Sequence, residues 1–232
     1  MEQDYIDWLY GLSAPMVILN KRYGASYTSP FFYPNDDFID LKESWEIDSR
    51  ETLLDCVFTM IDDGHAPLLS EFYSKYSQLS EFDWLSFYER QTDYHKVILK
   101  FVEQTFPICN IAGIRSWDYA RMAYLLRLGT TNKYVTEEEC LWILHRIGLR
   151  STYFYQSWQH YLVSWFIGLQ YWNNLQIKDD LEKLRCELSR PSKVTSMANL
   201  YEDKQAPFNR LPWFIDIEKF EKPESLREYD WL

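Results

Sequence analysis

Glycine is scarce in this chain of 232 residues, which contains 7. Turn-rich β-sandwiches need glycine in their turns, and nucleotide-binding loops use it to cradle phosphates. The sequence also lacks a Gly-x-Gly-x-x-Gly motif and a P-loop. These absences argue against a turn-rich β-sandwich and against a glycine-rich nucleotide-binding fold.

Paired cysteines and long apolar runs are also missing. The four cysteines stand alone at positions 56, 109, 140 and 186, and their spacing fits no zinc site, so we expect free core thiols in a reducing compartment. The longest apolar run, 161–171, is too short to cross a bilayer. The first residues lack the basic segment of a signal peptide. Together these features predict a cytoplasmic protein without a membrane partner.

Positive charge is in deficit, with 24 Lys and Arg against 35 Asp and Glu and a net charge of −11. Because Lys and Arg supply the affinity for phosphate, we expect no nucleic-acid partner. The acidity is concentrated between Asn35 and Asp63, where ten carboxylates face only Lys42 and Arg50, giving −8 of the −11. Such a local field favours a basic protein partner, and the simpler alternative is that it only maintains solubility.

Aromatic residues are abundant, at 18% of the chain, with 10 Trp and 18 Tyr. Large rings dominate the energetics of cores and of interfaces, where Trp and Tyr are typical anchors. We therefore expect some of these rings in the core and others on a binding surface.

Apolar residues recur at helical spacing, and no strand-like alternation continues for more than a few residues. The sequence predicts an all-α fold, a single compact domain over 1–232 with about six or seven helices. An irregular aromatic-rich arm spans 1–44, with one short helix from Asp4 to Leu12. The helical core spans 45–190, and 191–232 form a tail that docks through Trp213, Phe214 and Ile215.

Caps and breakers set the expected helix boundaries. Asp48 with Glu51 resembles a capping box, and Thr136 followed by three glutamates is a strong helix start. Gly129 and Pro107 are expected to end the helices that precede them. The expected helices are 48–63, 67–79, 80–107, 116–128, 136–150, 151–175 and 178–188.

Standard catalytic and metal-binding motifs, such as His-Glu-x-x-His and Gly-x-Ser-x-Gly, do not occur. His145 and His160 could meet between neighbouring helices with Glu139 as a third metal ligand, but ordinary packing of these residues is favoured. We therefore predict no catalytic residue, no metal and no cofactor. Whether the protein is an enzyme stays open, with the balance against it.

A polar and aromatic cluster near residue 118 is the most distinctive local feature. Asp118 and Arg121 stand three residues apart on one helical face and can pair beside Trp117. Two interpretations follow: a pocket in which this pair meets a ligand, or a buried ion pair that fixes the register of two helices. The second is favoured, since no nucleophile or second acid is evident. The conditional pocket comprises Arg115, Trp117, Asp118, Arg121, Trp158 and Tyr161.

Several of these motifs resemble the YbeU/YbeR-like bacterial family, a domain-of-unknown-function family. The resemblance covers about Trp45 to Trp213. It departs from the family at Ala66-Pro67, where a basic residue is common after the Gly64-His65 pair, so a ligand contact of that residue would be lost here. The resemblance implies a bacterial cytoplasmic protein and transfers no catalytic residue. It is carried by Arg115-x-Trp117-Asp118-x-x-Arg121, Arg127-x-Gly129, Tyr134-x-Thr136-x-Glu138-Glu139, Ser157-Trp158, Tyr161 and Gly168-x-x-x-Trp172.

The leading functional hypothesis is an immunity-type protein that binds and neutralises a cognate toxin or effector, expected to be basic. The alternative is an enzyme or small-ligand binder with a polar pocket around Asp118 and Arg121. A third possibility, that the chain is itself a toxin, is disfavoured by its acidity and by the lack of a catalytic set. The predicted partner-binding residues are Phe31, Phe32, Tyr33, Asp36, Asp37, Asp40, Glu43, Trp45 and Glu46.

Overall fold

The computed structural model describes residues 2–175, 202–216 and 219–229, and within them the regular structure is helical, with no β-strand. The all-α prediction is confirmed, although the helices are more numerous than six or seven. The α-helices are α1 (Gln3–Gly11), α2 (Ala14–Asn20), α3 (Lys42–Trp45), α4 (Arg50–Asp63), α5 (Ala66–Gln78), α6 (Glu81–Glu89), α7 (Asp93–Cys109), α8 (Arg115–Thr131), α9 (Glu137–Phe154) and α10 (Trp158–Leu175). Short 3-10 turns are η1 (Lys21–Tyr23), η2 (Asn110–Ala112), η3 (Pro207–Asn209) and η4 (Glu224–Leu226).

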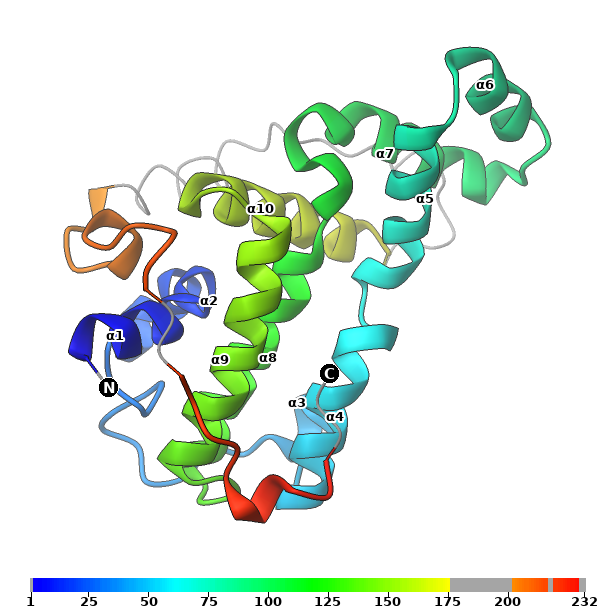
Figure 1. Cartoon of the computed structure of the whole chain (residues 1–232). Helices are drawn as coiled ribbons and strands as arrows, with labels where there is room; N and C mark the ends of the chain where they lie inside the picture. Colours follow the sequence, from blue (N-terminus) through cyan, green and yellow to red (C-terminus); the bar gives the residue numbers. More distant parts are fainter. Residues whose placement is uncertain (1, 176–201, 217–218, 230–232) are drawn as a thin grey trace.

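Helix α8 lies at the centre of the molecule, between α9 and α4, and α10 crosses its N-terminal end (Figure 1). Two glycines allow these close approaches. A Cβ atom at Gly129 would lie 2.2 Å from Cδ2 of Leu53, and one at Gly168 would lie 2.4 Å from Cβ of Trp117. The prediction that Gly129 ends its helix is therefore wrong. The residue is inside α8, where it makes room for α4.

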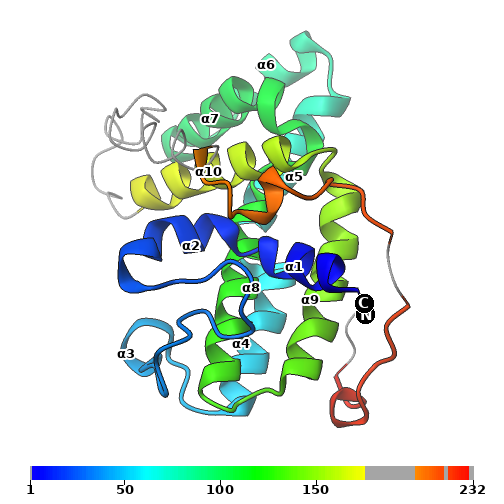
Figure 2. The same cartoon turned by 90° about the vertical axis from the view of Figure 1, so that its left-hand side faces the viewer.

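The N-terminal arm is more regular than predicted. The short helix expected from Asp4 to Leu12 is present as α1, but α2 and α3 follow it within 1–45. Pro15 lies in the first turn of α2, where a missing N–H costs no hydrogen bond, so it is compatible with a helix at this position of the arm. In Figure 2, α1 and α2 lie across the face of α8 and α9.

Helices α5, α6 and α7 form a lobe at one end of the molecule, with α6 at its tip (Figure 1). The single helix expected over 80–107 is divided into α6 and α7, because Thr92 caps a new helix. Pro107 does not end α7, which continues to Cys109. The lobe packs around a second hydrophobic cluster, which includes Tyr73, Trp84 and Leu99 and is completed by Ile167 and Tyr171 of α10.

The helix starts agree in part with the predicted caps. The box at Thr136 is confirmed, since the Thr136 hydroxyl accepts from the N–H of Glu139 and the Glu139 carboxylate accepts from the N–H of Thr136. The other box is formed by Ser49 with Thr52, one residue after the expected Asp48. Helix α10 begins at Trp158 instead of Ser151, because α9 continues to Phe154.

The C-terminal segment docks through Trp213, which is buried and donates from Nε1 to the carbonyl of Tyr155 at 2.7 Å. The helix predicted over 178–188 lies outside the described residues. In the described part of the chain, no single helix is long and apolar enough to cross a membrane. Two consecutive helical segments, 93–112 and 115–131, are long and apolar enough only when they are counted as one, and the chain bends by 59° between them.

Candidate functional site

The acidic segment forms an exposed face held on a rigid frame. Asn132, which follows α8, clamps the segment by accepting from the N–H of Ile39 at 2.8 Å and donating to its carbonyl at 2.7 Å. Leu41 and Ile47 anchor the same segment in the core. The predicted carboxylates Asp36, Asp37, Asp40, Glu43 and Glu46 are all exposed, and none forms a salt bridge with a described residue.

The aromatic side chains that were predicted to lie beside these carboxylates differ in how deeply they are buried. Phe31 is 41% exposed, but Phe32 is completely buried edge-to-face against Tyr124, so it belongs to the core and not to a surface. Tyr33 and Trp45 are partly buried. Phe38 is 64% exposed and was missed, although its position inside the acidic run, outside any helical period, was a usable signal.

Asp118 is a buried acid that completes the start of another helix. Its Oδ2 accepts from the N–H of Ala66, the first residue of α5, at 2.8 Å. A carboxylate is favoured at this position because helix N-termini present free N–H groups and a partial positive charge. A Cβ atom at Gly64 would lie 2.6 Å from the same oxygen, so only glycine leaves room for this contact.

Arg121 faces the other carboxylate oxygen of Asp118, Oδ1. Its Nη1 lies 3.4 Å from Oδ1 of Asp118 and donates to Nδ1 of His65 at 2.8 Å. The guanidinium lies between the rings of Trp45 and Trp117, 4.8 and 5.3 Å from their centroids. Burial lowers the pKa of Arg121, and the Asp118 carboxylate opposes that shift. The pair therefore joins α8 to the start of α5 and to Trp45 of α3.

A pocket of about 350 Å³ lies beside this junction. It contains two of the six residues predicted for the conditional pocket, Arg115 and Asp118. Arg115 stacks on the ring of Phe154, with its guanidinium carbon 4.3 Å from the centroid. The pocket is lined by Met60, Ile61, Ala66, Pro67, Ser70, Arg115, Asp118, Tyr119, Arg150 and Phe154.

Trp158 and Tyr161 are placed in a separate aromatic cluster. Trp158 lies against Trp8 and Trp213 at centroid distances of 5.7 and 4.8 Å, and its Nε1 donates to the carbonyl of Leu211. The Tyr161 hydroxyl donates to the carbonyl of Leu12 at 2.9 Å. These side chains tie the N-terminal helices and the C-terminal segment to α10, and neither lines the pocket beside Asp118.

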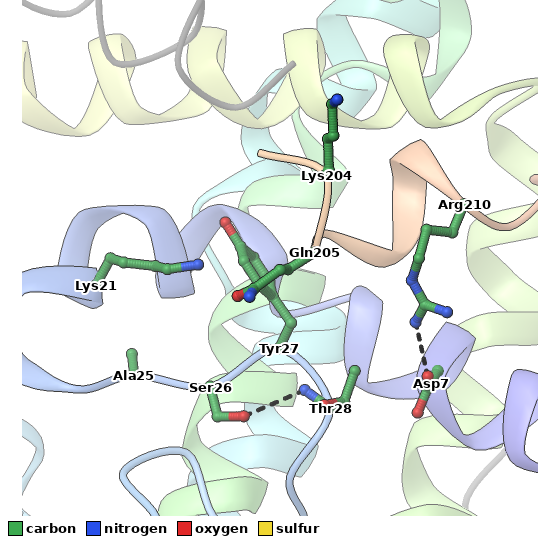
Figure 3. Close-up of a pocket in the computed structure, with 9 residues that line it drawn as sticks. All are labelled: Asp7, Lys21, Ala25, Ser26, Tyr27, Thr28, Lys204, Gln205 and Arg210. Carbon is green, nitrogen blue, oxygen red and sulfur yellow. Dashed lines mark hydrogen bonds and ion pairs between the residues drawn. The ribbon is translucent and has the colours of Figure 1, made fainter. Parts of the chain in front are cut away.

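A larger pocket, of about 600 Å³, lies between the N-terminal arm and the C-terminal segment (Figure 3). Two of its three cationic residues, Lys21 and Arg210, are paired with carboxylates, of which only Asp7 lines the pocket. Arg210 points to Asp7, with Nη2 2.7 Å from Oδ2, and Nζ of Lys21 lies 2.6 Å from Asp203. Lys204 points away from Asp7 in this view. The pocket is therefore polar but has little net charge aimed into it.

The residues considered as metal ligands have other partners. Glu139 binds Arg50, Nδ1 of His145 lies 2.7 Å from the Tyr5 hydroxyl, and Nε2 of His160 lies 3.1 Å from the carbonyl of Cys109. Over the described ranges, no group of three His, Cys, Asp or Glu is arranged to hold a metal ion. Cys109 and Cys140 are buried free thiols, and burial raises the pKa of each to about 12.

These features define an all-α protein whose surface combines an acidic face with an arginine-lined pocket. The family described as "Protein of unknown function (DUF1266)" matches residues 40–213. The chain is 33% identical over 231 residues to the uncharacterized protein YbeU of Escherichia coli (strain K12), covering 98% of this chain and 97% of the relative. It is 38% identical over 224 residues to the uncharacterized protein YbeR of the same strain, covering 95% of each.

The chain therefore belongs to this bacterial DUF1266 family, as the sequence motifs indicated. No solved structure matches the chain.

Proposed function

We propose that this protein binds a basic protein partner through its acidic face, and that the partner is a cognate toxin or effector that it neutralises. The observation that carries the proposal is the set of exposed carboxylates without salt bridges on the clamped segment 36–46. A folded protein gains little stability from such an arrangement, whereas a basic partner would gain both a faster encounter and a fixed orientation.

The segment also offers apolar anchors beside the charges. Phe38 and Phe31 are exposed within ten residues of the carboxylates, and exposed aromatic rings surrounded by polar groups are typical of interface centres. The Asn132 clamp holds the backbone at Ile39 in place, so little conformational entropy would be lost on binding. Pre-ordered charge with a neighbouring ring is what a tight inhibitor of a basic protein requires.

The test begins with a purification of the tagged chain from its own cells at low salt, and the basic protein that co-purifies is then produced separately. We compare wild type with a variant carrying Asp36→Asn, Asp37→Asn, Asp40→Asn and Glu43→Gln. Asn at position 40 keeps the oxygen that accepts from the N–H of Lys42. We expect about tenfold weaker binding, through slower association, and a shallower dependence on salt.

A matched control neutralises four exposed carboxylates of the α5–α7 lobe, Glu71, Glu81, Glu89 and Asp93, and should bind as wild type does. Growth of cells that express the partner supplies the second readout. Wild type and the control should rescue growth, and the acidic-face variant should rescue it less. The proposal would be refuted if the acidic-face variant and wild type bound the partner with equal affinity and equal salt dependence.

A further inference from the structure

Helix α6, at the tip of the α5–α7 lobe, carries an apolar stripe on its exposed side (Figure 1). Phe82 is 77% exposed and Leu85 is 54% exposed, whereas Trp84 of the same helix is buried. Residues three apart lie on one side of a helix, so Phe82 and Leu85 form a continuous apolar surface. Leu79, just before the helix, is exposed as well. Exposed apolar side chains that are grouped in this way mark a binding surface, whereas single scattered ones do not.

Two side chains of opposite charge flank this stripe. Asp83 and Arg90 are both exposed and stand seven residues apart, which is nearly two full helical turns, so they lie on the same flank of α6. Oδ2 of Asp83 accepts from the Ser80 hydroxyl at 2.6 Å, and Nε of Arg90 donates to the carbonyl of Ser86 at 2.8 Å. Among the described residues, Asp83 has no cationic partner and Arg90 has no carboxylate partner. Both charges are therefore available to another molecule.

The spacing of these charges makes the surface complementary to itself. In a two-fold pair of antiparallel α6 helices that meet along the apolar stripe, each flank of one helix faces the same flank of the other. A two-fold axis midway between Asp83 and Arg90 then places Asp83 of each copy opposite Arg90 of the other, which gives two ion pairs. The same axis places Leu85 beside Leu85 of the second copy, and Phe82 of each copy packs at one end of that contact.

One carboxylate on the stripe and the overall charge of the chain oppose this contact. Glu89 lies seven residues after Phe82 on the same side of α6, but Nζ of Lys96 is 3.6 Å from its Oε2 and offsets its charge. Because the whole chain carries −11, two copies repel one another at long range. A helix of 9 residues also buries little area. We therefore expect a weak dimer that depends on protein concentration.

We propose that α6 is the contact surface of a two-fold homodimer, in which Phe82 and Leu85 become buried and Asp83 of each copy pairs with Arg90 of the other. A second copy of the chain fits this surface because its unpaired charges have the spacing and the shared flank that a two-fold axis requires. In Figures 1 and 2, α6 lies at the opposite end of the molecule from α3, so the dimer leaves the acidic face free. The inference is therefore independent of the toxin-binding proposal.

The experiment is sedimentation equilibrium of the full chain from micromolar to millimolar concentration. We expect wild type to shift reversibly from monomer to dimer, and the Phe82→Ser, Leu85→Ser variant to remain monomeric. Urea unfolding checks that this variant is folded, as expected for side chains that are exposed in the monomer. The matched control, Tyr153→Ser with Phe214→Ser, removes two exposed rings outside α6 and should dimerise as wild type does. A wild type that stays monomeric would overturn the proposal and leave this surface to a different protein.

Charge reversal then tests the two-fold geometry. Asp83→Arg gives a chain with two positive charges at positions 83 and 90, and Arg90→Asp gives a chain with two negative charges there. Each variant alone should dimerise at least about tenfold more weakly than wild type, because like charges face one another. An equal mixture of the two should form a heterodimer as tight as the wild-type dimer, a rescue that misfolded variants could not produce. If each variant alone dimerised as wild type does, or if the mixture stayed monomeric, the pairing of Asp83 with Arg90 would be refuted.

Discussion

The two ends of α8 each carry an arginine without a described carboxylate partner, and the two arginines differ in burial. At the C-terminal end, Arg127 is completely buried and its donors are directed to Ser13 Oγ and to the carbonyls of Ser26 and Ser29, at 2.6–2.7 Å. At the N-terminal end, Arg115 is partly exposed and opens onto a pocket.

We distinguish two kinds of charged side chain. A closed charge is buried and is hydrogen-bonded by the protein, whereas an open charge is exposed to solvent and can bind a partner. A closed charge such as Arg127 has its two Nη atoms matched by acceptors of the protein, although its Nε has no partner among the described residues, so its removal leaves buried acceptors without donors. An open charge such as a carboxylate of the acidic face has water as its main partner, so its removal changes stability little. Arg115 is intermediate, because its Nη1 also donates to the carbonyls of Ile111 and Ala112. Closed charges should therefore register in unfolding experiments, and open charges in binding experiments.

Arg127→Met is expected to have the largest effect of the substitutions considered. It removes the donors to two backbone carbonyls and one hydroxyl, and it removes the cation that contacts the rings of Tyr10 and Phe32. With roughly 1–3 kcal/mol for each buried group left unsatisfied, we expect a loss of about 3 kcal/mol in the free energy of unfolding. Urea denaturation measures it, and limited proteolysis should show faster cleavage near 26–31.

The outcome is informative in both directions because a buried guanidinium is costly. Burial lowers the pKa of Arg127 to about 10, which reflects that cost. If the desolvation of the charge outweighed its hydrogen bonds, Arg127→Met would match or exceed wild-type stability. That result would mean that the arginine is kept for a reason other than stability, and the distinction between closed and open charges would fail. Arg127→Lys, which keeps the charge without the planar fork, should lose about half as much as Arg127→Met.

Glu139 supplies a second closed charge, and its effect depends on pH. Its carboxylate accepts two hydrogen bonds from Arg50, at 2.7 and 2.8 Å, and one each from the N–H of Thr136 and the hydroxyl of Ser225. Burial raises the pKa of Glu139, but the hydrogen bonds from Arg50, Ser225 and Thr136 outweigh it and hold the pKa at about 2. Glu139→Gln should cost about 1–3 kcal/mol at neutral pH.

The direction of the pH effect follows from the lowered pKa. The folded protein holds Glu139 ionised down to about pH 2, whereas the unfolded chain protonates it near 4.5. Its contribution is therefore complete above about pH 4.5 and is lost as the pH falls towards 2. Unfolding measured between pH 6 and 3 should show the stability of wild type approaching that of Glu139→Gln. A constant difference between the two proteins across this range would contradict the assignment.

Much of the fold could be predicted because helix signals are local. Thr136 with Glu139, and Ser80 before α6, mark helix starts through bonds that span three residues. The errors occurred where tertiary contacts decide. Gly129 was expected to end α8 because glycine is a poor helix former, but the contact with Leu53 requires a small residue there. Nothing within α8 itself reveals that α4 passes so close.

The candidate sites were less predictable for the same reason. The acidic segment was evident from charge counting, and its carboxylates are exposed. The depth of each ring was not evident, because Phe31 and Phe32 are neighbours with opposite exposure. The pairing of Asp118 with Arg121 followed from helical spacing, but the principal bond of Asp118 is to Ala66, 52 residues away in sequence. Arg150 carried no sequence signal that linked it to Arg115.

The smallest expected effect concerns the acidic face and has the opposite sign from the others. Asp36, Asp37 and Glu43 are open charges that repel one another, so the four-residue neutralised variant should be slightly more stable than wild type, by about 0.5 kcal/mol at low ionic strength. The gain should vanish near 1 M salt, where the Debye length is about 3 Å. The lobe control loses the pairs Glu71–Lys75 and Glu89–Lys96 and should show no gain. A loss above about 1 kcal/mol at both salt concentrations would reveal a structural role for these carboxylates. A small, salt-sensitive gain would instead indicate that the face is retained at a cost to stability, as expected of a surface that serves a partner.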